Sequence, residues 1–183
     1  MEYPPGFYDF SPVNIIPPRG AINSLNHLHL YMNIKEQFLK EEYIPLLEQL
    51  SDNEVGLWGV LSPQGMIEHM SDSVGAAYGR IKHPLTTAPE FLEKARTFML
   101  SDKPFKENTK NALMSEIPAP LRLHSMTEAI EELRNELEAF MDFYAAHPGH
   151  RELNAFFGEL NYEEQLHLLH KHAWHHLKQF NLD

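Results

Sequence analysis

Two histidines near the C-terminus, His172 and His176, have a spacing that could bind a metal ion. Residues four apart in a helix project from the same face, one turn apart. Because the helix already sets this separation, the pair provides two imidazole ligands at little entropic cost. The chain contains twelve histidines, so the same spacing can also arise by chance in a solvated or hydrogen-bonded pair. A metal site here needs a third ligand from elsewhere in the chain.

His69 is the candidate for that third ligand. It lies just outside an apolar stripe at helical spacing, formed by Ile67, Met70 and Val74. Three neutral imidazoles leave coordination positions open for water or substrate, as in catalytic rather than structural sites. Nitrogen ligands suit Zn²⁺, Ni²⁺ and Fe²⁺, and affinity order alone does not choose among them. We therefore predict a divalent transition-metal site built from His69, His172 and His176.

Two further residues could assist these ligands. Glu68 adjoins His69 and is either a helix-surface carboxylate or a partner that orients a ligand. Gln179 lies on the same predicted helix as His172 and His176, and it is either a helper of the site or a surface amide. His175 is expected to face solvent. The other C-terminal histidines are expected at the surface or in turns: His147, His150, His167 and His170.

Composition excludes several classes of protein. No cysteine is present, so a metal must be held by His, Asp, Glu or water, and the chain itself cannot supply a catalytic thiol. Fifteen Lys and Arg against 26 Asp and Glu give a formal charge of −11, which disfavours nucleic-acid binding because affinity for phosphates requires basic residues. The first residues do not read as a signal peptide, and no run of about 18 apolar residues could span a membrane. A cytoplasmic protein is the expectation.

The N-terminal half of the chain is predicted to contain an extended arm and two helices. Residues 1–22 are rich in proline and aromatics, which favours an extended arm packed along a surface. Residues 23–50 carry apolar side chains near one face of a helix, which Pro45 ends or kinks. Ser62 then signals an N-cap, and the second helix, which carries His69, closes at His83 and Pro84.

The C-terminal half begins with a long connection, residues 84–124, that contains one short helix at about residues 89–100. A capping box that starts at Ser125 opens the third helix, which stops at His147. The last helix begins at Asn161 and carries the histidine pair. No strand of useful length is evident. The predicted fold is all-α: a four-helix bundle over residues 23–183 with a long crossover between the second and third helices.

Two stretches of the sequence resemble the DinB-like superfamily of four-helix-bundle metal-binding proteins. Residues 58–69 match W-G-x-(L/M)-(S/T)-x-x-x-M-x-x-H, the start of the second helix in a branch described only as a domain of unknown function. Residues 157–164 and 172–180 match the ending of that branch, F-G-x-(L/M)-(S/T/N)-x-x-E and then H-x-x-H-H-x-x-Q-F. The motifs occur in the right order, and the similarity covers roughly residues 30–181.

The resemblance implies a bundle in up-down-down-up order, usually assembled as a homodimer. It also implies a metal held by one histidine of the second helix and two of the fourth, which correspond to His69, His172 and His176. The superfamily includes a mycothiol-dependent maleylpyruvate isomerase and bacillithiol S-transferases. In these enzymes the metal activates a low-molecular-weight thiol by lowering its pKa.

The leading hypothesis is a metal-dependent enzyme that acts on a small electrophilic molecule. A thiol-dependent S-transferase or isomerase fits, because the chain has no cysteine and the thiol would come from outside. Hydrolysis by a metal-activated water fits equally well. One alternative is a metal-binding module without turnover. Another is a dimeric structural or interaction protein whose main surface is the aromatic arm, with Tyr3, Phe7, Tyr8 and Phe10.

Overall fold

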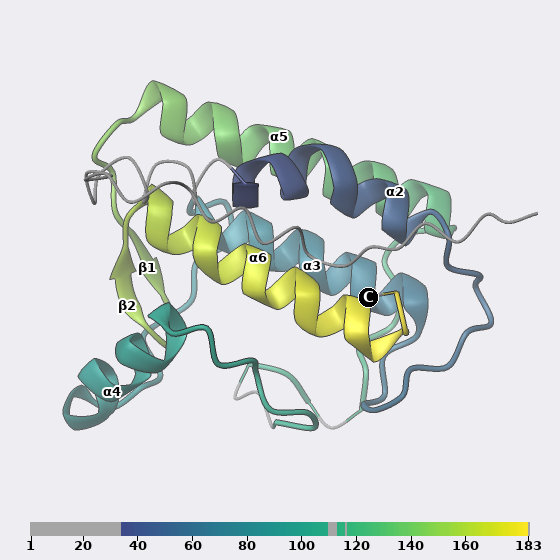
Figure 1. Cartoon of the computed structure of the whole chain (residues 1–183), viewed down its shortest axis with the longest axis horizontal. Coiled ribbons are helices and arrows are strands. Elements are labelled where there is room, and N and C mark those ends of the chain that lie inside the picture. Colours follow the sequence, from purple (N-terminus) through teal and green to yellow (C-terminus); the bar gives the residue numbers. More distant parts are fainter. Residues whose placement is uncertain (1–33, 110–112, 116, 183) are drawn as a thin grey trace, which may run out of the picture.

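The computed structural model describes residues 34–109, 113–115 and 117–182, and this part of the chain is mostly helical (Figure 1). The predicted arm, residues 1–22, and the start of the first predicted helix lie outside the described residues. The described elements are η1 (Phe38–Glu42), α2 (Tyr43–Leu47), α3 (Pro63–Ala77), α4 (Pro89–Leu100), α5 (Met126–Ala146), β1 (Glu152–Asn154), β2 (Gly158–Leu160) and α6 (Tyr162–Gln179). The prediction of a helical protein is confirmed, with one small sheet in addition. None of the described helices combines the length and the apolar character needed to cross a bilayer.

The first helical segment continues through Pro45, which was predicted to end or kink it. Residues 34–37 are helical and lead into η1, a π-helical stretch that α2 follows directly. In a regular helix the ring of Pro45 would meet the carbonyl group of Glu41. The widened π turn lies just before this point, and the Tyr43 N–H donates to the Phe38 carbonyl, five residues back. The segment therefore accommodates the proline and ends at Leu47.

Side-chain caps set the start of the two helices that carry the histidines. The Ser62 hydroxyl oxygen accepts a hydrogen bond from the Gly65 N–H at 3.1 Å and so begins α3. Asn161 and Glu164 form a complete capping box at α6, with both reciprocal hydrogen bonds at 2.9 Å. Such caps satisfy N–H groups that have no partner within the helix. Both predicted starts are confirmed.

The start of α5 and the end of α3 differ in detail from the prediction. Ser125 accepts from the Glu128 N–H at 3.2 Å, but the Glu128 carboxylate accepts from the His124 N–H rather than from Ser125, so the capping box is incomplete. Helix α3 ends at Ala77, before the predicted stop at His83 and Pro84. The reason is Gly79, whose φ of +85° lies in the left-handed region that terminates helices.

The core lies between the helices that run side by side in Figure 1. Helix α3 packs mainly against α5 and also against α6, and α2 contacts both α5 and α6. Each helix contributes an apolar stripe to this core: Ile44 and Leu47 from α2; Met66, Ile67, Met70 and Val74 from α3; Leu133, Leu137 and Phe140 from α5; Leu166, Leu169, Ala173 and Leu177 from α6. Burial of each large side chain contributes roughly 1.5–3 kcal/mol, so this contact fixes α3 and α6 relative to each other.

A short β-hairpin, absent from the predicted fold, precedes α6. Strands β1 and β2 pair antiparallel, with Glu152 opposite Leu160 and Asn154 opposite Gly158. The Asn154 side-chain oxygen accepts from the backbone N–H groups two and three residues later, which forms the turn. Arg96 of α4 donates to the carbonyl group of Glu159 in β2 at 2.9 Å. The hairpin and α4 therefore stand together at the end of the molecule where α6 begins (Figure 1).

Candidate metal centre

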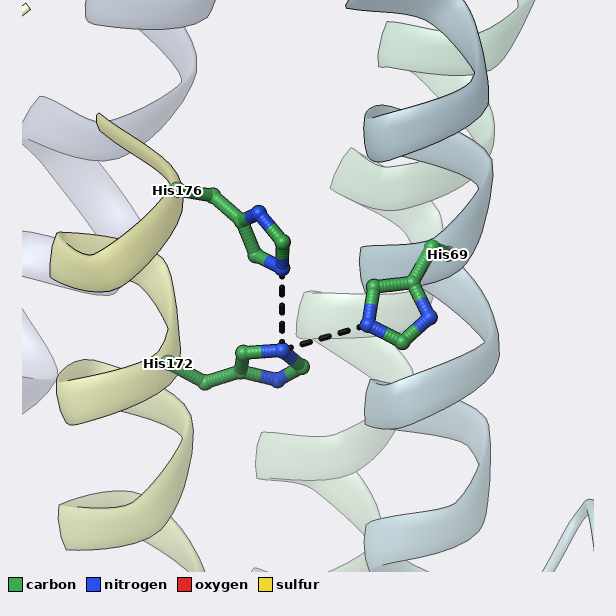
Figure 2. A group of neighbouring side chains, drawn as sticks. All are labelled: His69, His172 and His176. Carbon is green, nitrogen blue, oxygen red and sulfur yellow. Dashed lines mark hydrogen bonds between the residues drawn. The ribbon is translucent and has the colours of Figure 1, made fainter. Parts of the chain in front are cut away.

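The three histidines predicted as ligands lie together between α3 and α6. Figure 2 shows the ring of His69 projecting toward the rings of His172 and His176 from the facing helix. The Nε2 atom of His172 lies 3.2 Å from Nε2 of His69 and 3.0 Å from Nε2 of His176. One ligand atom of each residue lies within 4.8 Å of the other two. The three side chains are close enough to bind a single metal ion.

Helical geometry places these imidazoles at the edge of the core. On α6, Ala173 and Leu177 are fully buried, and each directly follows one of the two histidines. The histidine pair therefore lies on the flank of the buried stripe, with His172 half-buried and His176 buried. On α3, His69 stands in the same way beside the fully buried Met70. Side chains on the facing flanks of two packed helices meet, and these three do.

The surroundings keep all three imidazoles neutral. Burial, with a smaller effect from the charge of His175, lowers the pKa of His69 from 6.5 to about 4. Burial and the neighbouring His69 lower the pKa of His176 to about 3. Burial and the charges of His176 and His69 hold the pKa of His172 well below 6.5. A neutral imidazole has a lone pair on one ring nitrogen, and this is the form that binds a metal.

The hydrogen bonds of Gln179 determine which nitrogen of His176 has the lone pair. The Gln179 Nε2 group donates to the carbonyl oxygen of Trp58 at 2.7 Å. Since a carbonyl group only accepts, the amide nitrogen must face Trp58, and the amide oxygen then faces His176 Nδ1 at 2.7 Å. His176 Nδ1 must therefore carry the hydrogen and donate it. The Nε2 atom, which faces the other two histidines, is left with the lone pair.

The three imidazole nitrogens are arranged better for binding a cation than for hydrogen bonding to one another. His176 Nε2 has no hydrogen to donate, and a neutral His172 has at most one on Nε2, which points in one direction. At most one of the two short contacts of His172 is therefore a good hydrogen bond. Two nitrogens about 2.05 Å from one tetrahedral zinc ion are about 3.3 Å apart, close to the observed 3.0 and 3.2 Å. The residues present fit a divalent metal.

Glu68 has a different set of partners from those predicted for an orienting residue. Its buried carboxylate accepts from the backbone N–H groups of Arg122 at 2.8 Å and Leu123 at 3.1 Å, and from the Gln64 side chain at 3.0 Å. Burial alone would raise the pKa of Glu68, but these hydrogen bonds and the Arg122 charge lower it overall. The carboxylate therefore ties α3 to the segment that leads into α5.

Three of the other histidines are less exposed than predicted. The ring of His170 accepts from the Trp174 indole N–H at 3.1 Å, and His167 Nε2 lies 2.9 Å from the Met99 carbonyl oxygen. His175 was expected to face solvent but is half-buried. Periodicity on α6 placed these side chains outside the apolar stripe, yet other segments cover them. Met99 of α4 lies against His167, Phe38 of η1 against His170, and Phe105 against His175. His147, by contrast, is exposed at the end of α5, as predicted.

Aromatic side chains that the sequence analysis did not select stand beside the histidines. The ring centroid of Phe105 lies 6.2 Å from that of His172 and 6.0 Å from that of His175, edge-on in both cases. The Trp58 ring lies 5.7 Å from His175. The Trp58 indole nitrogen is buried and has no hydrogen-bond partner among the described residues. Phe105 lies in a long irregular connection, where no periodicity could have pointed to it.

The low pKa values predict that the metal-free protein loses stability in weak acid. The unfolded chain takes up protons on histidine near pH 6.5, whereas burial lowers the pKa of His69 to about 4 and that of His176 to about 3 in the folded protein. Between these values the unfolded state binds more protons, so the free energy of unfolding falls as the pH decreases. Each such histidine contributes up to about 1.4 kcal/mol per pH unit.

Urea denaturation of chelator-treated protein between about pH 7 and pH 5 measures this slope. The His176→Gln variant has no titratable side chain at position 176. Its free energy of unfolding should therefore depend less steeply on pH than that of the native chain. Equal slopes for the two proteins would contradict the prediction.

Comparisons with protein-family models, curated proteins and solved structures give no match to this chain. The DinB-like resemblance therefore stays a prediction that rests on the two motifs, and the function is argued from the site itself.

Proposed function

We propose that His69, His172 and His176 hold a divalent transition-metal ion, Zn²⁺, Ni²⁺ or Fe²⁺, and that the protein is a metal-dependent enzyme acting on a small electrophilic molecule. The observation that carries the proposal is the convergence of three neutral imidazoles through Nε2. The lone pair of His176 Nε2, set by Gln179, adds to it. Three protein ligands leave room for a further ligand, as in catalytic sites.

When bound, such an ion supplies Lewis acidity and lowers the pKa of a coordinated water or thiol. The residues of this chain supply position and environment. The three histidines come from two helices that a shared core holds together, so the ligands are already in place before binding. The rings of Phe105, beside His172, and of Trp58, beside His175, provide apolar surface near the ligands.

The packing of the helices supports the finer part of the fold prediction. The first helical segment, α3, α5 and α6 share one core, which is what a four-helix bundle of the DinB-like kind requires. In that family's terms the nucleophile is an external thiolate or a water, and the reaction is an S-transfer, an isomerisation or a hydrolysis. A homodimer in the cytoplasm, with a small-molecule substrate and no nucleic-acid or membrane partner, completes the proposal.

A metal-binding protein without turnover is the second candidate. The observation that favours it is the position of the Phe105 ring beside His172 and of the His175 ring beside His176. Aromatic rings so close to the ligands could cap a bound ion and leave no space for a substrate. A groove of about 520 Å³ lies elsewhere, between the first helical segment, α5 and the start of α6, and none of the three ligands lines it. Catalysis, rather than metal content, separates the two candidates.

The test uses protein purified without an affinity tag. We expect it to contain about one equivalent of a transition metal, and we expect it to accelerate the reaction of a low-molecular-weight thiol with chlorodinitrobenzene. Chelation should remove this rate, because the thiol pKa rises when the ion is lost. Added metal should restore the rate, because the bound ion lowers the thiol pKa again. Metal content below about 0.2 equivalents that added metal does not raise would exclude the metal site. Full metal content with a rate indifferent to chelation would favour the non-catalytic candidate.

A further inference from the structure

The loop of residues 56–59, just before α3, holds the side chain that sets the tautomer of His176. The Trp58 carbonyl oxygen accepts from the Gln179 amide at 2.7 Å. One residue earlier, the Leu57 N–H donates to the Gln179 backbone carbonyl group at 2.7 Å. Gln179 is buried and is the last residue of α6. The loop therefore fixes both the main chain and the side chain of this glutamine.

Two glycines allow the loop to approach Gln179 this closely. A Cβ atom on Gly56 would lie 3.1 Å from the Gln179 Cγ atom. A Cβ atom on Gly59 would lie 2.8 Å from the Gln179 Nε2 atom, closer than real Cβ atoms come to their neighbours. Gly59 also has a φ of +76°, which favours glycine. The amide of Gln179 thus sits in a cradle that any side chain at residue 59 would fill.

The Trp58–Gly59 peptide group is itself held at both ends. Its carbonyl group accepts from Gln179, and its N–H group donates to the Asn108 side-chain oxygen at 3.1 Å. A peptide with both polar groups engaged cannot rotate without losing hydrogen bonds worth about 1 kcal/mol each. Its carbonyl oxygen consequently keeps pointing at the amide nitrogen of Gln179.

We propose that the loop of residues 56–59 is a positioning element of the metal site: through the Gln179 amide it keeps the hydrogen of His176 on Nδ1 and leaves Nε2 free to bind the metal. Rotation of the amide by half a turn would put its nitrogen against His176 and its oxygen against the Trp58 carbonyl oxygen. His176 would then carry its hydrogen on Nε2, the atom that must coordinate. The loop opposes this exchange because two carbonyl oxygens repel each other.

The proposal rests on the proposed metal function, and one of its measurements does not need a metal. In metal-free protein, long-range ¹H–¹⁵N correlation spectra report which ring nitrogen of His176 carries the hydrogen. We expect Nδ1–H in the native chain and a mixture of tautomers in Gln179→Leu. Failure of the native chain to bind any metal would overturn the proposed function alone. A hydrogen on Nε2 of His176 in the native chain would overturn the positioning role.

Gly59→Ala tests the loop without removing any polar group. We expect it to weaken Co²⁺ binding about 10- to 100-fold, the range typical of losing a partner that orients a ligand. Gly149→Ala is the matched control, because Gly149 has a φ of +86° and nothing lies within 4 Å of an added Cβ. Both variants place a side chain at a positive φ, but only Gly59→Ala displaces Gln179.

Gln179→Leu should weaken Co²⁺ binding to the same extent as Gly59→Ala. Its control is Gln165→Leu, which removes another buried amide from the same helix, about 21 Å away along the axis. The visible spectrum of bound Co²⁺ reports the ligand set, which a loss of stability elsewhere does not change. Native affinity and an unchanged Co²⁺ spectrum in folded Gly59→Ala and Gln179→Leu would overturn the proposal.

Discussion

Replacing His172 with alanine should reduce bound divalent metal from about one equivalent per chain to less than about one tenth. His172 is the central member of the site, since its Nε2 atom lies within 3.2 Å of the Nε2 atoms of both His69 and His176. Its removal leaves two imidazoles on different helices. The chain has no cysteine that could replace the lost ligand. Elemental analysis of tag-free protein, together with Co²⁺ titration, measures the loss.

His124→Ala is the control for this variant, because His124 is exposed and precedes α5. It removes one of the twelve histidines without touching the site and should keep the native metal content. The metal-free His172→Ala protein should remain folded, since a half-buried imidazole with a depressed pKa contributes little to the core. Retention of a full equivalent of metal by His172→Ala would show that the ion binds elsewhere.

Glu68→Ala should destabilise the protein by about 2–4 kcal/mol and leave the metal content unchanged. The carboxylate is buried and accepts from the backbone N–H groups of Arg122 and Leu123 and from Gln64. Without it, these part-buried donors lose their acceptor, at a cost of about 1 kcal/mol each. Urea denaturation of metal-free protein measures the change in the free energy of unfolding.

Glu131→Ala is the comparison on α5. Its carboxylate is paired with Arg134, and its side chain is 62% exposed, so the change in stability should stay within about 0.5 kcal/mol. Metal content separates the two roles considered for Glu68. A loss of metal affinity with native stability would mean that Glu68 orients a ligand after all, whereas the structure supports a role in joining α3 to the segment before α5.

The local features of the fold followed from the sequence. Ser62 and Asn161 predicted the starts of α3 and α6 correctly, because an N-cap side chain bonds to backbone only a few residues away. The short helix α4 was predicted over the residues that form it, 89–100. The hairpin before α6 was missed, since strands of three residues are too short to show an alternating pattern. The first helical segment continues two residues past Pro45, to Leu47, because the rare π turn before the proline makes room for its ring.

For the site, the sequence by itself determined that His172 and His176 share one face of a helix, since that spacing is a property of the helix alone. Tertiary structure decided the rest. It brings His69 to His172 across 103 residues of chain and turns Gln179, either helper or surface amide from sequence, into a partner of His176 and Trp58. It also buries Glu68, either a helix-surface carboxylate or an orienting partner from sequence, against the backbone N–H groups of Arg122 and Leu123. The physical reason is that a polar side chain bonds to the groups that packing brings within hydrogen-bond distance. Which groups these are depends on segments far apart in the sequence.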